Sequence, residues 1–457
     1  MPSEKIRMQA SDLRPQQTLG VIFWFRNDLR LHDQLALQSA IEQAQQLGGW
    51  LLPIYIHDER WHAVTPWGFE RTGKHRRAWV RMALDDLSTH LTALGSRLVE
   101  ACGDPVRILS NLVHGLGNPM LWCEDICAPE EQQCVEALRG QGVEVHAIWQ
   151  STLMDPLALP FLPEDVPDRF TSFRQMLESQ QVRAAAPLEA IRHMPPLPAP
   201  GLMANCDVLY DPVRPAADVD LPQPDRRSSF PWDPPGFHGG ETSALAHLAH
   251  YCRRGLPHTY KTTRNALAGV DHSTKWSPWL ATGALSARTA WAAIANFEAS
   301  HGANESTYWL GFELLWRDHF RWLHRKHGRR LYAARGLSNL PPAPHNPVAF
   351  ERWCSAQTGN PFIDAGMKEL ALTGYLSNRM RQNVASYLVH DLACDWRAGA
   401  AWFEAHLVDF DVYSNQGNWL YISGRGTDPR PHRRFNPQLQ AGTYDPDGSY
   451  RALWAQA

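Results

Sequence analysis

The first 150 residues alternate between short apolar runs and longer segments with helical periodicity. Runs rich in β-branched and aromatic residues occupy 20–26 (GVIFWFR), 51–58 (LLPIYIHD), 118–125 (NPMLWCED) and 143–149 (VEVHAIW). Between them, residues 34–47 and 79–94 carry apolar side chains at helical spacing. Strands that alternate with helices predict a parallel sheet of about five strands with helices on both faces.

The pattern changes after this region. Residues 156–237 are rich in proline, which predicts an extended connector with one short helix near 171–180. Long stretches of helical periodicity follow Gly239. We therefore expect a doubly wound α/β domain over 20–155, the connector over 156–237 and an all-α domain over 238–457. No Gly-x-Gly-x-x-Gly loop follows the first strand, which runs directly into RNDLRLHD, so a conventional dinucleotide site is not expected there.

Composition excludes several classes of protein. The chain is 44% apolar and 20% charged and has no apolar stretch long enough to span a membrane. Its first residues lack the apolar core of a secretory signal, so we expect a cytoplasmic protein. Cys123, Cys127 and Cys134 lie close together, but their spacing matches no standard zinc or iron–sulfur pattern, and no metal is expected. Because the net charge is −3, any contact with nucleic acid must come from a local basic patch.

The segment from 373 to 440 has an unusual density of polar residues beside apolar ones. If 375–394 forms one helix, four of its residues share one stripe: Asn378, Arg381, Gln382 and Ala385. Such a stripe lines a ligand cavity or a solvated face. Asp409, Asp411 and Asn415 then follow as a compact set of hydrogen-bond acceptors. One carboxylate can pair with Arg381 while the other accepts hydrogen bonds from a ligand.

Two further segments supply complementary chemistry. Ser273, Thr274, Lys275 and Ser277 precede a helix that is predicted to open at Pro278, where hydroxyls, N–H groups and a cation suit a pyrophosphate. An ordinary helix cap is the alternative. In 313–322, the predicted helix places Glu313, Trp316 and Arg317 on one face. A carboxylate beside an aromatic ring suits an extruded base, and an amphipathic helix is the simpler alternative.

Several motifs together resemble one known family. VIFWFRNDLRLHD, STKWSPWLATGALS, TGYLSNRMRQNVASYLVHDLACDWR and NWLYISGRGTDPRPHRRFNPQLQ resemble the photolyase/cryptochrome family in the same order. The resemblance runs from about residue 20 to 450, and SNRMRQNVASYL and DVYSNQGNWLY resemble its DASH subgroup in particular. It implies a blue-light-dependent flavoprotein, expected to be a monomer, that repairs cyclobutane pyrimidine dimers in UV-damaged DNA.

The resemblance implies one non-covalent FAD inside the helical domain. Its phosphates are expected at Tyr260, Ser273, Thr274, Lys275, Trp276, Ser277 and Arg317, and its ring at Asn378, Arg381, Asp409, Asp411 and Asn415. In the implied mechanism the excited reduced flavin donates an electron to a flipped dimer, the dimer splits, and the electron returns. This chemistry needs no catalytic triad, and none is evident in the sequence.

The resemblance also implies a pocket for the dimer. Glu313, Trp316, Gln382, Tyr421 and Asn415 would line it, and Gln382 and Tyr421 are DASH-like where enzymes for duplex DNA carry methionine and tryptophan. A more polar pocket offers less stacking to offset base flipping, so we expect a preference for single-stranded or looped DNA. The alternative function is a signalling blue-light photoreceptor with little repair activity.

Three departures and one basic cluster complete the expectations. Trp419 and Trp396 match the first two members of the family's photoreducing chain, but 341–350 lacks the third, so Trp353 or Tyr332 is the expected exit. Met82 replaces the glutamate with which DASH proteins usually bind a folate antenna, and Asp33-Gln34 replaces the usual Asp-Asn, so methenyltetrahydrofolate is a doubtful second cofactor. The arginines expected to contact DNA phosphates are Arg379, Arg425, Arg430, Arg433 and Arg434.

Overall fold

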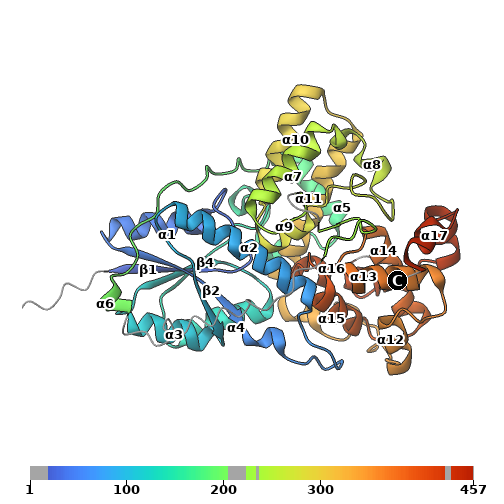
Figure 1. Ribbon diagram of the computed structural model, residues 1–457, viewed down its shortest axis with the longest axis horizontal. Helices are drawn as coiled ribbons and strands as arrows, with labels where there is room; N and C mark the ends of the chain where they lie inside the picture. The colour runs from blue at the N-terminus through green and yellow to red at the C-terminus, as the bar shows by residue number, and fades with distance from the viewer. Residues whose placement is uncertain (1–18, 204–222, 233–235, 428–433, 456–457) are drawn as a thin grey trace, which may run out of the picture.

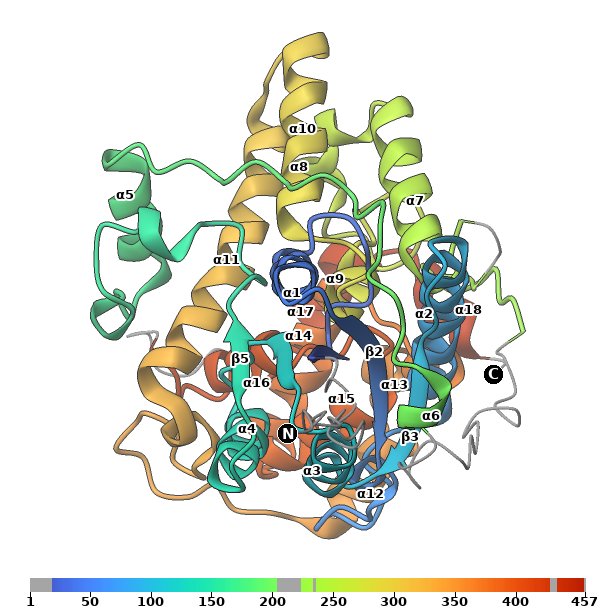
Figure 2. The same cartoon turned by 90° about the vertical axis from the view of Figure 1, so that its left-hand side faces the viewer.

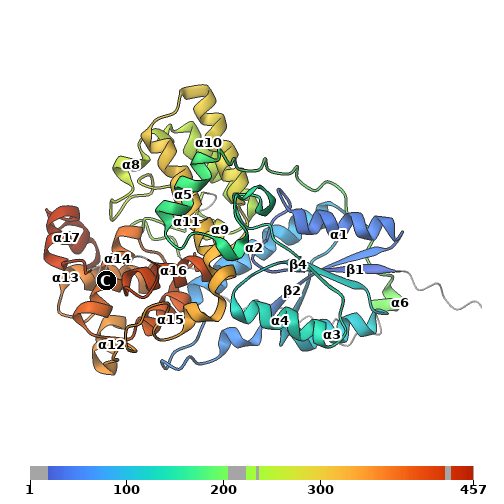
Figure 3. The same cartoon turned by 180° about the vertical axis from the view of Figure 1, so that it is seen from behind.

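The computed structural model describes residues 19–203, 223–232, 236–427 and 434–455 (Figure 1). Arg430 and Arg433 lie outside the described residues, so the structure does not bear on their expected contacts with DNA. An α/β layer structure occupies one side of the molecule and a group of helices the other, as Figure 1 and the reverse view in Figure 3 show.

The α/β domain contains five parallel strands in the order β3-β2-β1-β4-β5. The strands are β1 (Gly20–Phe25), β2 (Trp50–Asp58), β3 (Val99–Gly103), β4 (Met120–Glu124) and β5 (Val145–Ile148). Helices α1 (Leu35–Gln46) and α2 (Lys74–Ala93) cover one face, and α3 (Pro105–Gly115) and α4 (Pro129–Gly140) cover the other (Figure 1). The predicted fold class is therefore confirmed.

The strands are apolar throughout because both faces of the sheet are buried. In β1, Val21, Phe23 and Phe25 pack against α1 and α2. Ile22 and Trp24, which alternate with them, pack against α3 and α4. Edge strand β3 (VEACG) has the weakest apolar pattern and was the one strand that the sequence did not delimit.

The first part of the connector, including α5 (Phe170–Ser179), packs on α11 (Glu305–His327), whereas residues 180–203 lie on the surface of the α/β domain. After α5, the chain passes α1 and reaches α6 (Pro200–Met203) near β3 (Figure 2). Backbone hydrogen bonds tie it down: Asp33 donates to Leu188, Ile191 donates to Leu31, and Leu51 donates to Pro196. A segment that lacks a core of its own is thus ordered by the domain beneath it.

The rest of the described chain is helical. Its helices are α7 (Glu241–Arg253), α8 (Tyr260–Thr263), α9 (Ser277–Thr282), α10 (Ala287–His301), α11 (Glu305–His327), α12 (Pro347–Cys354), α13 (Pro361–Thr373), α14 (Asn378–Ser386), α15 (Trp396–His406), α16 (Val412–Ile422), α17 (Pro437–Tyr444) and α18 (Ser449–Ala455).

The prediction of one helix over 375–394 was wrong. Gly374 ends α13 with φ at +69°, and the Ser377 side chain then caps α14 by accepting a hydrogen bond from the Met380 N–H. A π-helical turn over Tyr387–Asp391 follows α14. The break leaves the stripe on α14 intact, since its four residues lie within the shorter helix.

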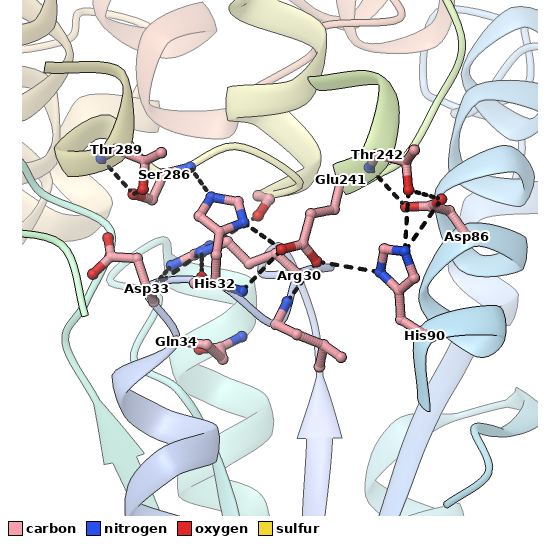
Figure 4. Close-up of polar contacts among 12 residues, drawn as sticks. Arg30, His32, Asp33, Gln34, Asp86, His90, Glu241, Thr242, Ser286 and Thr289 are labelled. Atoms are coloured by element: carbon pink, nitrogen blue, oxygen red, sulfur yellow. Dashed lines mark hydrogen bonds and ion pairs between the residues drawn. The ribbon is translucent and has the colours of Figure 1, made fainter. Parts of the chain in front are cut away.

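The loop that follows β1 docks the α/β domain onto the helical domain. The carboxylate of Glu241, the first residue of α7, accepts hydrogen bonds from the N–H groups of Leu31 (2.7 Å) and His32 (2.9 Å) and contacts His32 Nδ1 at 2.6 Å (Figure 4). Arg30 donates across the same interface to the carbonyl of Gly283. Position 283 requires a glycine, because its φ is +71° and a Cβ there would lie 2.0 Å from the carbonyl oxygen of Asn27.

Glu241 gives this interface a pH dependence. Burial opposes its charge, but hydrogen bonds from His32 and His90 hold the pKa of Glu241 below its ordinary value. The unfolded chain therefore binds a proton more readily than the folded protein does, so the contribution to stability is present above the ordinary pKa of a glutamate and is lost as the pH falls.

We expect Glu241→Gln to lower the free energy of unfolding by about 2 kcal/mol at pH 7, because it removes charge-assisted hydrogen bonds at a buried position. The deficit should shrink as the pH falls below about 4, where Glu241 of the unfolded wild-type chain takes up a proton that the folded protein does not yet bind. Chemical denaturation of both proteins at several pH values measures this. Glu189→Gln, at a side chain that is 90% exposed, is the matched control. Equal loss in both variants at pH 7 would contradict the expectation.

Candidate functional site

A cavity of about 510 Å³ opens within the helical domain. Its walls come from the segment before α9, from α11, from the start of α14 and from the segment that leads into α16. Of the residues predicted to bind a cofactor, the cavity brings together Tyr260, Ser273, Thr274, Lys275, Trp276, Ser277, Arg317, Asn378, Arg381, Asp409 and Asp411. The predicted substrate residues Glu313, Trp316, Gln382 and Tyr421 line the same cavity.

Lys275 is the cation at one end of the cavity. It is 4% exposed, and none of the ion pairs between described residues includes it. Burial lowers its pKa to about 8, with Glu369 acting in the opposite direction. A buried ammonium without a carboxylate partner is stabilised by an anionic ligand. The hydroxyls of Ser273, Thr274 and Ser277 lie on the same wall, so this end suits phosphate groups.

The backbone at Lys275 has an uncommon conformation. Lys275 has φ at +56°, an uncommon value for a residue with a side chain. Helix α9, which begins two residues later, is only six residues long, so its dipole contributes little compared with the buried cation. His247 Nε2 donates a hydrogen bond to the carbonyl of Thr274 (2.9 Å) and so supports this segment.

Arg381 and Asp409 form an ion pair on another wall of the cavity, with 2.8 Å between Arg381 Nη2 and Asp409 Oδ2. This pairing agrees with the sequence-based hypothesis. The Asp409 side chain is 1% exposed, and its Oδ1 is buried without a hydrogen-bond partner. The Arg381 charge is thus fixed beside the cavity.

Asp411 is not a free acceptor. Its Oδ1 accepts a hydrogen bond from Arg321 Nη2 (3.0 Å), and its other oxygen accepts one from the Ser414 N–H and caps α16. Although burial favours the neutral form, Arg321 and Arg317 hold the pKa of Asp411 below its ordinary value. The sequence did not identify Arg321, because only the packing of α11 against α16 brings it to this carboxylate.

Of the residues predicted to contact the DNA substrate, Glu313 and Trp316 lie on α11. Trp316 stacks on Phe170, with ring centroids 3.8 Å apart and an interplanar angle of 11°, and meets Tyr421 edge-on. Glu313 is paired with Arg264, a cavity residue that the sequence analysis missed. Arg264 also lies over the ring of Trp309 at 4.8 Å. Because 45 positions separate Arg264 from Trp309, no local sequence pattern could have predicted this contact.

Two residues predicted to bind the cofactor, Arg317 and Asn415, make hydrogen bonds that the sequence did not predict. The guanidinium of Arg317 donates to the carbonyls of Ser151 and Leu280, and burial lowers its pKa to about 10. Asn415 donates from Nδ2 to the carbonyl of Ala400 (3.0 Å). It lines a narrow extension of about 90 Å³ that shares Asn378, Arg381, Gln382, Asp409 and Asp411 with the main cavity.

The three predicted electron-transfer residues lie in one aromatic core. Trp419 lines the narrow extension, whereas Trp396 lines a separate cavity between the domains. Trp353 is fully buried, and its ring lies 6.3 Å from that of Phe403, which in turn lies 5.1 Å from Trp419. Trp353 therefore cannot be the solvent-exposed end of a chain. Tyr332 lines the interdomain cavity together with Trp396.

The three predicted DNA-binding arginines that the structure describes, Arg379, Arg425 and Arg434, do not form one exposed patch. Arg425 is 7% exposed and donates to the carbonyl of Pro341, so its prediction as a surface contact was wrong. Arg379 donates to Gln382 Oε1 (2.9 Å) and Asn265 Oδ1 (2.8 Å). Arg434 is exposed and paired with Asp391.

A cavity of about 600 Å³ lies between the domains, at the carboxyl ends of β1 and β4 where the strand order reverses. Trp24, Tyr55 and Trp61 line it, together with arginine and glutamate side chains. Open α/β sheets bind ligands at such a position. Met82 is 6% exposed in the core beside Trp79 and does not line this cavity. The expectation that folate is a doubtful second cofactor stays a prediction.

Comparisons with known proteins agree with this geometry. A family model for DNA photolyase matches residues 21–200, and one for the FAD-binding domain of DNA photolyase matches 309–457. The chain is 41% identical to Cryptochrome DASH of Gloeobacter violaceus over 450 residues, which cover 96% of this chain and 85% of the relative. It is likewise 41% identical to Cryptochrome DASH of Xenopus laevis, covering 95% and 82%.

The chain belongs to the photolyase/cryptochrome family. Among solved structures, it is similar to a Synechocystis sp. PCC6803 cryptochrome, with a TM-score of 0.84, 37% identity and coverage of 95% of this chain and 88% of the other. It is also similar to a bacterial class III photolyase from Agrobacterium tumefaciens, with a TM-score of 0.75, 28% identity and coverage of 98% and 88%. The predicted resemblance is thereby confirmed.

FAD is the cofactor of this family's helical domain, and the main cavity fits it. A buried cation without an ion-pair partner meets the pyrophosphate requirement at one end. On another wall, a fixed guanidinium and an unsatisfied carboxylate oxygen suit the polar edge of a flavin ring. Leu280, Leu310 and Leu314 supply apolar surface to the same cavity.

No described helix is both long and apolar enough to cross a membrane. No group of three or more histidine, cysteine or acidic side chains among the described residues is arranged to hold a metal ion.

We expect Lys275→Met to weaken FAD binding at least tenfold, because it removes a buried charge-assisted contact to phosphate. Titration of the flavin-free protein with FAD, followed by flavin fluorescence, measures the dissociation constant. Lys261→Met is the control, since Lys261 pairs with Glu305 and does not line the cavity. A Lys275→Met protein that binds FAD like wild type would contradict the assignment of this end to the phosphates.

Proposed function

We propose that the protein repairs cyclobutane pyrimidine dimers in DNA under blue light and that it prefers single-stranded or looped DNA. One observation carries the proposal: a single cavity contains both the residues predicted to hold FAD and those predicted to receive the dimer. Reduced FAD, when bound and excited by light, supplies the electron that opens the dimer. The chain itself has to position the two reactants and exclude water.

Each wall of the cavity has a part in this proposal. The Arg381–Asp409 pair keeps a positive charge beside the ring, which favours an anionic reduced flavin. Trp316, held by its stack on Phe170, offers a fixed aromatic face to a flipped base. Glu313 supplies a carboxyl group that can bond to the base edge once Arg264 turns away from it.

The preference for single strands rests on the opposite wall. Gln382 is a polar side chain that already accepts a hydrogen bond from Arg379, and Tyr421 meets Trp316 edge-on at 6.1 Å and not face to face. Such a pocket gives little stacking energy to offset the unpairing of a duplex, which costs roughly a few kcal/mol. An unpaired strand does not incur the cost of unpairing.

We expect the reduced protein to remove dimers from a single-stranded oligonucleotide in blue light and to leave them in darkness, with much slower repair of the duplex. Chromatography of the irradiated DNA counts the dimers that remain. Glu313→Gln should retain FAD but repair at least tenfold more slowly, whereas Glu305→Gln, on the same helix and outside the cavity, should match wild type. A protein that binds FAD and responds to light but repairs neither substrate would instead favour a photoreceptor.

For photoreduction, we propose that electrons reach the flavin through Trp419 and Trp396. Trp419 lines the extension of the FAD cavity, and Trp396 lines the interdomain cavity beside Tyr332. A Cβ at Gly399 would lie 2.1 Å from the Trp419 ring, so this glycine lets α15, which begins at Trp396, pack closely on Trp419 of α16. Because Trp353 is fully buried, Tyr332 is the better candidate for the exit.

We expect Trp396→Phe to slow photoreduction of oxidised FAD at least tenfold in the presence of a thiol, because it interrupts this chain. Repair by chemically reduced protein should be unchanged, which separates electron supply from repair. Absorbance of the flavin during illumination gives the rate, and Trp454→Phe, a buried tryptophan on α18, is the control. An unchanged rate in Trp396→Phe would remove Trp396 from the pathway.

A further inference from the structure

A second apolar cavity lies directly behind the proposed dimer pocket. It has a volume of about 460 Å³, within the range of small-molecule sites, and its lining includes the start of α5, one face of α11 and α16. Figure 3 shows where these three helices lie. Its inner lining is apolar and includes Leu323, Leu331, Leu337 and Leu420. No role considered so far uses this cavity.

The two cavities share a wall of aromatic rings. Trp316, Phe320 and Tyr421 line both of them. Phe320 is fixed by Gly417 of α16, where a Cβ would lie 2.2 Å from the Phe320 ring. Trp316 is fixed by its parallel stack on Phe170, which also lines the second cavity. Only this wall separates an occupant of the second cavity from the dimer pocket.

The second cavity suits a neutral, planar group with a phosphate outside it. Burial lowers the pKa of His319 and of His324 to about 4, so both rings that line the cavity are uncharged at neutral pH. The exposed side chains at its rim are Arg169, Thr171 and Ser172, which carry one cation and two hydroxyls. An aromatic interior with a cationic, hydroxylated rim is the usual way of binding a base of a single strand.

We propose that this cavity binds the nucleobase next to the dimer in a single-stranded substrate. The proposal rests on the repair function proposed above and adds a subsite to it. Because Phe170 covers one face of Trp316, the flanking base would lie against Phe320 and Tyr421 from the side opposite the dimer, while its phosphate lies near Arg169. In a duplex that base is paired and stacked, so the subsite would contribute to the preference for unpaired DNA.

The test uses three single-stranded oligonucleotides with one dimer each. One has an adenine on both sides of the dimer, one lacks the base on the 5′ side, and one lacks it on the 3′ side. We expect removal of the base on one side to weaken binding about tenfold, the effect of one base–aromatic stack, while light still repairs the dimer. A 2-aminopurine at the sensitive position should lose fluorescence on binding, because it stacks on the aromatic wall.

The variant that fills the cavity is Leu337→Trp, and its control is Leu340→Trp, at a side chain that is 42% exposed and does not line the cavity. Leu337→Trp should bind all three oligonucleotides equally and leave the 2-aminopurine bright, whereas Leu340→Trp should behave like wild type. If Leu337→Trp does not fold, the wild-type comparison and the 2-aminopurine signal decide alone.

The outcomes separate this inference from the repair function. Equal binding of the three oligonucleotides by wild type, with repair intact, would overturn the subsite and would instead indicate a cavity for a small apolar molecule. Full discrimination in a folded Leu337→Trp protein would overturn it as well. If none of the oligonucleotides is repaired in light by the reduced protein, the repair function fails, whatever the binding shows.

Discussion

The arrangement of this protein depends on the docking of one loop, 26–33, against the helical domain. Glu241 neutralises and orients the loop through two backbone N–H groups and His32, and Arg30 reaches the carbonyl of Gly283 on the far side (Figure 4). Gly283 follows α9, whose first residues form the phosphate end of the cavity. The loop that a nucleotide-binding domain would use for phosphates therefore serves here to hold the cofactor-binding helices in place.

This docking also explains why two cavities lie on either side of α16. Asn415 contacts both the narrow extension of the main cavity and the interdomain cavity. The α/β domain closes the interdomain cavity with the carboxyl ends of β1 and β4 and leaves the main cavity within the helices. Helix α16 thus separates the interdomain cavity from the main cavity and its extension.

Among the charged groups of the main cavity, a buried lysine has no carboxylate partner in the described part of the chain and would be neutralised by an anionic ligand. Arg381 has a carboxylate partner and Asp411 has Arg321, whereas Lys275 is buried with no carboxylate partner among the described residues. A buried unpaired cation is costly, and its cost falls when an anion binds. The aromatic wall differs from this charged part of the cavity. Packing already fixes the rings of Trp316 and Phe320, so ligand binding would cost little side-chain entropy there.

Much of this protein follows from the sequence alone. The apolar runs of β1, β2 and β4 predicted a parallel sheet because both faces are buried, and the proline content of 156–237 predicted a connector without a core. The motifs around 273–277, 378–382 and 409–411 predicted the cofactor set, since these segments resemble a known family. Tertiary structure decided what depends on contacts between distant segments: the Arg321–Asp411 and Arg264–Glu313 pairs, the burial of Arg425 and Trp353, and the position of Met82 away from the interdomain cavity. Local patterns fix which face of a helix is polar, but only packing decides which of those polar groups meet.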